Sequence, residues 1–350
     1  MSTFYPLPVK EIKSLTPSSV AITLGIGEEF KEQFQFKAGQ YITIKKDING
    51  EELRRAYSIS SAPGEPDITI GVKRVDRGSF SDYANNKLKE GDVLEVSVPE
   101  GRFVFDSDQK TEIMAFAAGS GITPIMSIAR TVLGSHPENK FVLVYGNQNL
   151  AETMFYEEIR ALQDEYTDRF FVQYVCSRAR EEDALFGRID SSVVNYALKN
   201  KFKDLDIDAF YLCGPEPMIN AVKEVLADKG VSSDKILFEL FTTTESETDM
   251  EAQEIGEGKT QVTVILDDEE QQLVMDRKEL VLDAVLKAKI DAPYSCQGGV
   301  CSTCIARITE GKAVMEKNQI LTDGEIADGF VLTCQAHPTT PTLTVDYDDV

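Results

Sequence analysis

The chain has 350 residues and a mass of 38.8 kDa, which exceeds one ordinary hydrophobic core and predicts two or three domains. Its 59 acidic and 36 basic side chains give a formal net charge of −23, which disfavours nucleic acid and anionic membranes as partners. With only two histidines, histidine-based triads and multi-histidine metal sites are nearly excluded. The sequence shows no apolar run of membrane-spanning length and no signal-peptide pattern, so we expect a cytoplasmic protein without stable membrane association.

The first block, residues 1–107, contains short segments with β-strand character that are separated by Gly, Pro and Asp. Several short strands at this spacing predict an antiparallel β-barrel or sandwich. The expected strands are residues 20–24, 40–44, 67–74 and 93–98.

The second block, residues 108–241, alternates apolar strands with amphipathic helices. This alternation predicts an α/β domain in which helices surround a parallel sheet. The expected strands are residues 113–118, 141–145, 170–176 and 209–213, and the expected helices are residues 124–133, 152–162 and 216–229.

The third block follows an acidic segment, residues 242–259, which we interpret as an extended linker because its like charges repel one another. Residues 260–350 then predict a small α+β domain. Its expected elements are a hairpin of residues 261–266 and 272–275, a helix at 280–290, and strands at 304–308 and 343–347.

Four cysteines in the third block have a diagnostic spacing. Three lie close together with four and then two residues between them, and the fourth follows thirty positions later. This spacing is typical of a plant-type 2Fe-2S cluster, and Gly298 and Gly299 would let the loop turn tightly around it. Zinc usually takes two close pairs, and a reducing cytoplasm disfavours disulfides. We therefore predict as cluster ligands Cys296, Cys301, Cys304 and Cys334.

Two strand ends in the second block have the pattern of a nucleotide-binding site. The first consists of Gly119, Ser120 and Gly121, followed by Thr123 as the expected N-cap and Pro124 as the expected first helical residue. The second is Cys213, Gly214 and Pro215, which also leads into a helix. A short Gly-x-Gly turn also ends strands for purely structural reasons. Two such ends meeting at one crevice favour a pyrophosphate site, because helix N-termini attract anions.

Ser177 and Arg178 follow the expected strand at 170–176. A hydroxyl and a guanidinium at this position suit the 2′-phosphate of NADP, whereas an NAD site more naturally carries an acid there. The alternative is an ordinary surface arginine. We predict NADPH as the nucleotide, with NADH less favoured.

Polar and aromatic residues in the first block suit a flavin but are ambiguous alone. Arg55, Tyr57 and Ser58 could neutralise a pyrophosphate, stack on a ring and reach a ring nitrogen, yet such residues also occur on ordinary strands. A second strand and a turn able to give amides to phosphate add to the pattern. They comprise Gly71, Val72 and Lys73, and then Gly78, Ser79, Phe80 and Ser81.

Taken together, these residues resemble the ferredoxin-NADP reductase family over essentially the whole chain. Residues 55–58 match its flavin motif, 78–81 its phosphate turn, 119–124 and 213–215 its nucleotide motifs, and 238–241 the segment that closes the nucleotide domain. Ser120 stands where relatives often carry another glycine. The resemblance implies a flavin held by Arg55, Ala56, Tyr57 and Ser58, with Tyr57 on the isoalloxazine and Ser58 near N5. It also implies that Cys213 lies beside the nicotinamide, that Ser58, Cys213 and Glu239 are the candidate catalytic residues, and that Phe241 contacts a cofactor.

The block order is similar to that of reductase subunits of multicomponent oxygenases. The resemblance implies an FAD-binding β-barrel domain at 1–107, an NAD(P)-binding α/β domain at 108–241 and a β-grasp 2Fe-2S ferredoxin domain at 260–350. Electrons would pass from NADPH through FAD and the cluster to an oxygenase component of several subunits with a di-iron centre. The open alternatives are a reductase for a Rieske dioxygenase, a steroid hydroxylase or a fatty-acid desaturase, and a redox-sensing protein that binds nucleotide and cluster without turnover.

Overall fold

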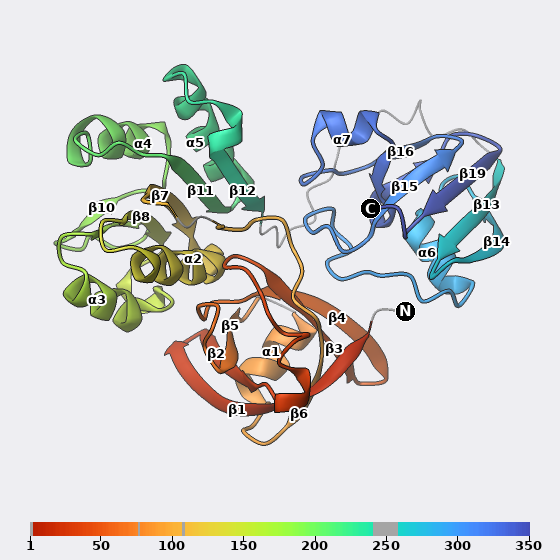
Figure 1. The fold of residues 1–350 in the computed structure, drawn as a ribbon, viewed down its shortest axis with the longest axis horizontal. Coiled ribbons are helices and arrows are strands. Elements are labelled where there is room, and N and C mark those ends of the chain that lie inside the picture. The colour runs from red at the N-terminus through yellow and green to blue at the C-terminus, as the bar shows by residue number, and fades with distance from the viewer. Residues whose placement is uncertain (1–2, 76–77, 107–108, 241–257) are drawn as a thin grey trace. The chain divides into compact units, whose positions relative to one another are not determined.

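The structure is a computed structural model that describes residues 3–75, 78–106, 109–240 and 258–350 (Figure 1). The described residues form two compact units: a larger one within 5–53 and 57–240, and a smaller one of residues 258–350 with residues 3–4 and 54–56. The linker predicted at 242–259 lies outside the described residues except for its last two, and Phe241 lies outside them as well.

An antiparallel six-stranded sheet, ordered β4-β3-β6-β1-β2-β5, contains the strands of the first sequence block. Ile59, directly after β4, bridges Ile70 of β5, so the two edge strands meet and the sheet curls into a barrel. Apolar side chains that alternate along the strands fill its interior. The strands are β1 (Phe4–Thr16), β2 (Ser19–Gly25), β3 (Tyr41–Ile48), β4 (Glu51–Ser58), β5 (Asp67–Lys73) and β6 (Val93–Ser97).

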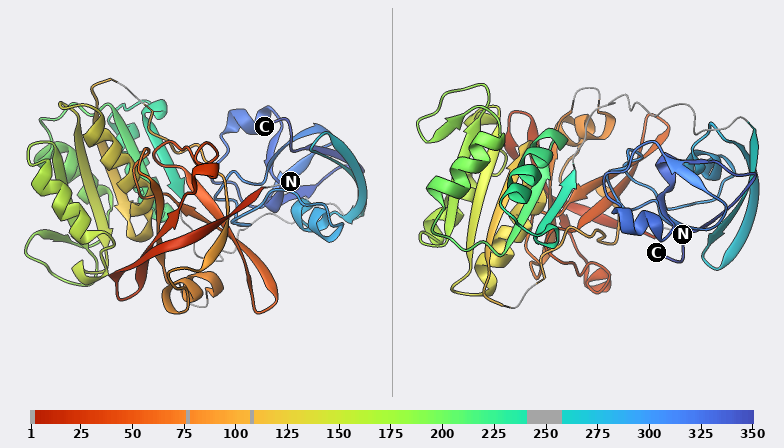
Figure 2. Two further views of the ribbon diagram at one scale, coloured as in Figure 1. Left: turned by 60° about the horizontal axis from the view of Figure 1, so that its bottom comes forward. Right: turned by 90° about the horizontal axis from the view of Figure 1, so that it is seen from above.

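The second sequence block forms a parallel sheet ordered β10-β9-β8-β7-β11-β12. Helices α2 and α3 cover one face and α4 and α5 the other (Figures 1 and 2). The strands are β7 (Glu112–Ala118), β8 (Lys140–Asn147), β9 (Phe170–Cys176), β10 (Ala184–Phe186), β11 (Ala209–Gly214) and β12 (Ile236–Leu240). The helices are α2 (Ile122–Ser135), α3 (Tyr156–Glu165), α4 (Ser191–Tyr196) and α5 (Glu216–Asp228).

Helix α3 begins four residues later than the sequence predicts. Phe155 adopts a left-handed conformation with φ of 58°, which separates a short 3-10 turn at Leu150–Glu152 from the α-helix. The expected start at 152 was therefore wrong, although the buried side chain of Ile159 faces the core as the pattern requires.

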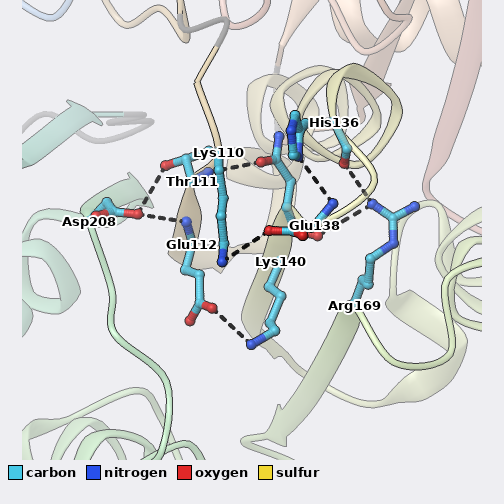
Figure 3. A network of polar contacts seen from close by, with 9 residues as sticks. Lys110, Thr111, Glu112, His136, Glu138, Lys140, Arg169 and Asp208 are labelled. Carbon is cyan, nitrogen blue, oxygen red and sulfur yellow. Dashed lines mark hydrogen bonds and ion pairs between the residues drawn. The ribbon is translucent and has the colours of Figure 1, made fainter.

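The amino ends of the parallel strands are joined by polar contacts (Figure 3). Asp208 accepts a hydrogen bond from the Glu112 amide at 2.8 Å, and the Glu112 carboxylate pairs with Lys140 at 2.8 Å. Arg169 donates to the carbonyl oxygen of His136 at 2.9 Å. We call this region the amino edge, defined by Thr111, Glu112, His136, Lys140, Arg169 and Asp208.

The smaller unit has a five-stranded sheet ordered β14-β13-β19-β15-β17 and a two-stranded sheet of β16 and β18. Helix α6 buries Val281, Leu282 and Val285 in its core. The helix expected at 280–290 ends at Lys287, because Lys289 turns with φ of 64°. The elements are β13 (Lys259–Leu266), β14 (Glu269–Asp276), α6 (Val281–Lys287), β15 (Ile305–Glu310), β16 (Ala313–Met315), α7 (Asp323–Ala327), β17 (Phe330–Leu332), β18 (Ala336–Pro338) and β19 (Thr342–Asp346).

These sheets confirm the predicted fold class, an antiparallel β domain and a parallel α/β domain followed by a small α+β domain. In the part of the chain that the structure describes, every helix is too short or too polar to cross a membrane.

Candidate functional site

The glycine turn after β7 leads directly into α2. Gly119 has φ of 55°, a conformation that glycine adopts readily, and Gly119–Gly121 form one 3-10 turn. Thr123 was wrongly expected as the N-cap: Gly121 takes that position, and the Thr123 hydroxyl donates to the Ser120 carbonyl at 3.0 Å inside the helix. Pro124 is therefore the third helical residue, where its missing amide hydrogen still costs no intrahelical bond.

The two predicted strand ends lie side by side. β7 and β11 pair in parallel with Ala117 opposite Cys213, and a Cβ placed on Gly121 would lie 2.2 Å from the Cys213 carbonyl oxygen. Gly214 takes φ of 157°, and Pro215 then caps α5. Both helix N-termini thus begin at the same edge of the sheet, which we call the carboxyl edge, defined by residues 118–124 and 213–216.

Strand β5 of the barrel contacts the carboxyl edge. A Cβ on Gly71 would lie 2.7 Å from Cγ2 of Thr123, so only glycine permits this approach. The Lys73 ammonium lies 3.8 Å from the position of a Cβ on Gly119. Although the sequence grouped Gly71 and Lys73 with the flavin motif, the structure places a positive charge beside the nucleotide turn, where a phosphate would be attracted.

Sequence reasoning missed Tyr145, which supports the glycine turn from β8. Its buried hydroxyl donates to the Gly119 carbonyl oxygen at 2.9 Å. Burial raises the pKa of this tyrosine, so the hydroxyl stays a donor. The only sequence signal was the position of this tyrosine in an apolar strand. Such a strand is buried, and a buried Tyr hydroxyl needs a hydrogen-bond partner.

The expected phosphate turn at 78–81 is the start of a helix. Gly78 is the N-cap of α1 (Ser79–Asn86), and a Cβ there would lie 2.3 Å from Cγ2 of Val75. Ser81 donates its hydroxyl to the Gly78 carbonyl at 3.2 Å, so this side chain stabilises the turn. A helix start presents amides without intrahelical acceptors, so the amides predicted to face a phosphate belong to the first turn of α1.

The flavin-motif residues separate into core and surface positions. Tyr57 is half-buried and lies against Phe80, with ring centroids 5.5 Å apart and planes inclined by 40°. Phe80 and Val72 are buried in the barrel core, so Val72 could offer a cofactor only its backbone. Arg55 is exposed and donates to the Arg54 carbonyl at 2.7 Å, while Ala56 and Ser79 are half-buried and exposed, respectively.

Three candidate catalytic residues from distant segments meet at the carboxyl edge. Ser58, at the end of β4, donates to Oε2 of Glu239 at 3.4 Å. Glu239 in β12 is the direct cross-strand neighbour of Cys213 in β11. All three are buried, with exposed fractions of 3%, 6% and 0% for Ser58, Glu239 and Cys213. The structure therefore unites the residues that the resemblance selected.

Burial determines the protonation state of two of these residues, Glu239 and Cys213. Removal from water raises the pKa of Glu239 to about 8, and the hydrogen bond from Ser58 acts in the opposite direction. Burial, and secondarily the neighbouring Glu239, raises the pKa of the Cys213 thiol. At neutral pH a proton thus resides on both groups, which keeps negative charge out of this part of the carboxyl edge.

Ser177 and Arg178 follow β9 at the same end of the sheet. The Ser177 hydroxyl donates to the Asn147 carbonyl at 3.2 Å, and the Arg178 amide donates to the Gln148 carbonyl at 2.8 Å. Arg178 is exposed, so its guanidinium is open to a ligand from solvent.

The four predicted ligand cysteines lie together in the smaller unit. Sγ of Cys301 lies 3.1 Å from Sγ of Cys296, and the Gly298 amide donates to Cys296 at 3.4 Å. Hydrogen bonds from Cys301 and Cys334 lower the pKa of Cys296, and one from Cys334 lowers that of Cys304. All six cysteines are free thiols. In the described ranges no group of three or more His, Cys, Asp or Glu, these cysteines included, is arranged to hold a single metal ion.

The surroundings of these cysteines fit a 2Fe-2S cluster. Ser295, directly before Cys296, has a buried hydroxyl that finds no hydrogen-bond partner among the described residues, and a cluster sulfur would satisfy it. The Gln335 side chain donates to the carbonyl oxygens of Gln297 at 3.1 Å and Cys334 at 2.7 Å, which fastens the loop to the distant ligand. Four thiolates with nearby donors are the ligand set that such a cluster takes.

Three segments match known domain families. Residues 6–105 match an oxidoreductase FAD-binding domain, residues 116–224 an oxidoreductase NAD-binding domain, and residues 264–339 a 2Fe-2S iron-sulfur cluster binding domain. With the fold and the two sites, these matches define the class: the protein is an NAD(P)H-dependent flavin/iron-sulfur reductase of the kind that serves oxygenase systems.

Within that class, the chain belongs to the family of oxygenase reductases that includes one of the subunits of 1,2-phenylacetyl-CoA epoxidase from Escherichia coli (strain K12). The two chains are 36% identical over 99% of each. The ferredoxin reductase component of 3-ketosteroid-9-alpha-monooxygenase from Rhodococcus rhodochrous is 29% identical over 97% of this chain and 96% of its own. The solved structure of phthalate dioxygenase reductase shares the fold, with a TM-score of 0.63 and 23% identity over 98% of each chain.

Proposed function

We propose that this protein is the reductase component of a phenylacetyl-CoA epoxidase, oxidising NADPH and passing electrons to an oxygenase component of several subunits with a di-iron centre. The observation that carries this proposal is 36% identity over 99% of both chains to one of the subunits of that enzyme. We place the protein in the cytoplasm, where the six free cysteines would stay reduced.

The proposed domains are residues 1–107 for FAD, 108–241 for the nucleotide and 260–350 for the cluster. A nicotinamide supplies two electrons as hydride and a 2Fe-2S cluster takes one, so a bound flavin couples the two. In support, each family match falls inside one proposed domain. Cys296, Cys301, Cys304 and Cys334 are the proposed cluster ligands.

The proposed task of the larger unit is to hold two rings and their phosphates. Tyr57 would stack on the flavin, with Arg55 and the first turn of α1 at its pyrophosphate. The amides of residues 119–121, together with Lys73, would bind the phosphates of the nucleotide. Contact between β5 and α2 at Gly71 supports this division, because it fixes the barrel against the nucleotide turn.

Ser58, Glu239 and Cys213 are the proposed positioning and catalytic groups at the nicotinamide. Their burial excludes water, and the raised pKa of Glu239 keeps its carboxyl protonated near neutral pH.

The cluster assignment is tested by paired cysteine variants. Cys301→Ser should abolish the iron-sulfur signal and electron delivery to the oxygenase, while reduction of an artificial dye by NADPH persists. Cys176→Ser makes the same chemical change at a buried thiol at the end of β9 and should keep the cluster. If Cys301→Ser retained stoichiometric iron and acid-labile sulfide, the assignment would fail.

NADPH preference is tested at Arg178. Arg178→Ala should narrow the ratio of kcat/KM for NADPH over NADH by about 10-fold to 100-fold, since a charge-assisted hydrogen bond contributes about 1.5–3 kcal/mol. Lys229→Ala removes one exposed positive charge beyond the end of α5 and serves as the control. Equal kcat/KM for the two nucleotides in the unaltered protein would refute the role of Ser177 and Arg178.

The acceptor is tested by reconstitution. The reductase, NADPH and phenylacetyl-CoA are combined with the oxygenase component of a phenylacetyl-CoA epoxidase, and epoxide formation is compared with NADPH consumed. We expect coupled turnover there and uncoupled NADPH oxidation with the oxygenase of a 3-ketosteroid monooxygenase. Coupling only with the latter would overturn the proposal.

A further inference from the structure

His337 is a buried histidine whose two ring nitrogens both face hydrogen-bond acceptors. It lies in β18, three residues after Cys334, and is 3% exposed. Nδ1 lies 3.1 Å from the carbonyl oxygens of both Arg277 and Glu279, and Nε2 lies 2.7 Å from Oε1 of Glu316. The proposed hydride and nucleotide chemistry does not use this residue.

The geometry fixes the number of protons. A neutral imidazole has one N–H and one lone pair, and a carbonyl oxygen can only accept, so Nδ1 must carry a hydrogen. The short contact between Nε2 and Glu316 then needs a second proton, on the ring or on the carboxyl. All of these contacts are satisfied together when the pair holds one proton more than a neutral ring beside a carboxylate.

The other histidine shows the contrast. Nδ1 of His136, which is half-buried at the amino edge, accepts a hydrogen bond from the Glu138 amide at 3.2 Å. That nitrogen must have a lone pair, so this ring is satisfied without an extra proton. The chain thus contains a matched control for a change at His337.

The His337–Glu316 pair is tied to the cysteine site through the backbone. The Glu316 amide donates to the Gln335 carbonyl at 2.8 Å, and the Gln335 side chain holds the cysteine loop through its bonds to Gln297 and Cys334. The Gln319 amide donates to the Gly299 carbonyl at 3.2 Å, so the segment after β16 lies on that same loop. Gln335 therefore links the pair to the cysteine loop through hydrogen bonds.

The charged side chains of the two residues whose carbonyl oxygens contact the ring have other partners. The Arg277 guanidinium donates to the Thr260 hydroxyl at 3.3 Å, and Glu279 pairs with Lys287 of α6. Glu316 is thus the carboxylate that faces the ring, and its side chain is 40% exposed, which gives the proton a route to water. The further charged residues on the adjoining segments are Lys278, Asp283, Lys312 and Lys317.

We propose that the proton held by His337 and Glu316 stabilises an added electron at the four-cysteine site and thereby sets its reduction potential. The inference rests on the proposed cluster ligands. One electron arrives from the flavin, and the positive charge of the proton attracts it. When rising pH removes the proton through Glu316 to water, that attraction is lost, so the potential falls as pH rises.

The test is the midpoint potential of the cluster in the holoprotein, followed by the EPR signal of its reduced form from about pH 5 to about pH 9. The unaltered protein and His136→Gln should show the same fall with rising pH. His337→Gln should show no fall and a more negative potential at low pH, because Gln cannot carry the charge. Glu316→Gln should move the fall to lower pH, because the imidazolium loses its counter-charge.

A potential that stays constant with pH in the unaltered protein, or the same fall in His337→Gln, would overturn the inference. If His337→Gln fails to assemble a cluster, the test rests on Glu316→Gln. A midpoint potential with the same pH dependence in Glu316→Gln as in the unaltered protein would then contradict the proposal. Absence of any iron-sulfur EPR signal in the unaltered protein would instead contradict the proposed function, so the two failures are distinguishable.

Discussion

The two edges of the parallel sheet are built from the same strands and differ in how their polar groups are used. At the amino edge, carboxylates, lysines and backbone amides satisfy one another, as with Asp208, Glu112 and Lys140. At the carboxyl edge, glycines let backbone segments approach closely, two helix N-termini begin, and the Lys73 ammonium lies beside the turn at Gly119. The amino edge stabilises the sheet, whereas the carboxyl edge presents donors to a ligand.

The largest effect is expected from a side chain at Gly121. Gly121→Ala would place a methyl group 2.2 Å from the Cys213 carbonyl oxygen and force the two strand ends apart. We expect kcat/KM for NADPH-dependent dye reduction to fall by at least about 100-fold, since a shift of about 1 Å in a reacting group costs that much.

Gly134→Ala in the same helix is the control for that change. A Cβ there meets nothing within 4 Å, so the variant should keep its activity and gain about 0.5–1 kcal/mol of stability from the better helix former. Full activity of Gly121→Ala would show that contact between the strand ends is not required.

The next effect concerns the buried carboxyl at the carboxyl edge. The pKa of Glu239 is raised from 4.5 to about 8, so between these values the folded protein holds a proton that the unfolded chain has lost. The free energy of unfolding should therefore fall as pH rises across this range. Glu239→Gln should remove that contribution, which amounts to a few kcal/mol because one pKa unit equals about 1.4 kcal/mol.

The measurement for Glu239 is denaturant unfolding of the unaltered protein and of Glu239→Gln at a series of pH values. The stability difference between them should favour the variant increasingly towards about pH 8. A difference that does not change with pH would contradict the raised pKa.

The smallest effect is expected at the amino edge. Asp208→Ala removes the acceptor for the Glu112 amide, but this exposed edge lets water replace it, so the loss of stability should be about 1 kcal/mol. NADPH-dependent dye reduction should be unchanged. A loss of activity comparable with that of Gly121→Ala would abolish the distinction between the two edges.

Helices and strands with a regular pattern of apolar residues could be predicted from the sequence, and elements without such a pattern could not. Strands β7, β8, β9 and β11 of the parallel sheet are continuous apolar runs, so their positions were predicted, whereas the edge strands β10 and β12 were not. In the barrel, β1 contains Pro6 and Pro8 and β4 is mostly polar, so neither was predicted. The start of α3 depends on the left-handed conformation of Phe155, and a phenylalanine in the sequence does not indicate such a conformation. The short strands β16, β17 and β18 follow from tertiary pairing.

The candidate site residues also differ in whether a local sequence pattern identifies them. Cysteine spacing alone predicted the thiols that the structure brings together, because one loop supplies three of them. The meeting of Ser58 with Glu239, 181 positions apart, came from a family resemblance and from no local pattern. The support of Gly119 by Tyr145 and the nearness of Lys73 to that turn depend on how β8 and β5 pack, which single-sequence periodicity does not encode.

Hydrogen–deuterium exchange of the holoprotein with and without NADP⁺ shows whether the nucleotide binds at the carboxyl edge, as we propose. We expect slower amide exchange on nucleotide binding in peptides that cover residues 118–124 and 213–218, where the two helices begin. Peptides covering residues 110–112, 136–140 and 206–209 at the amino edge should exchange as before. Protection at the amino edge, or none at the carboxyl edge, would contradict the account.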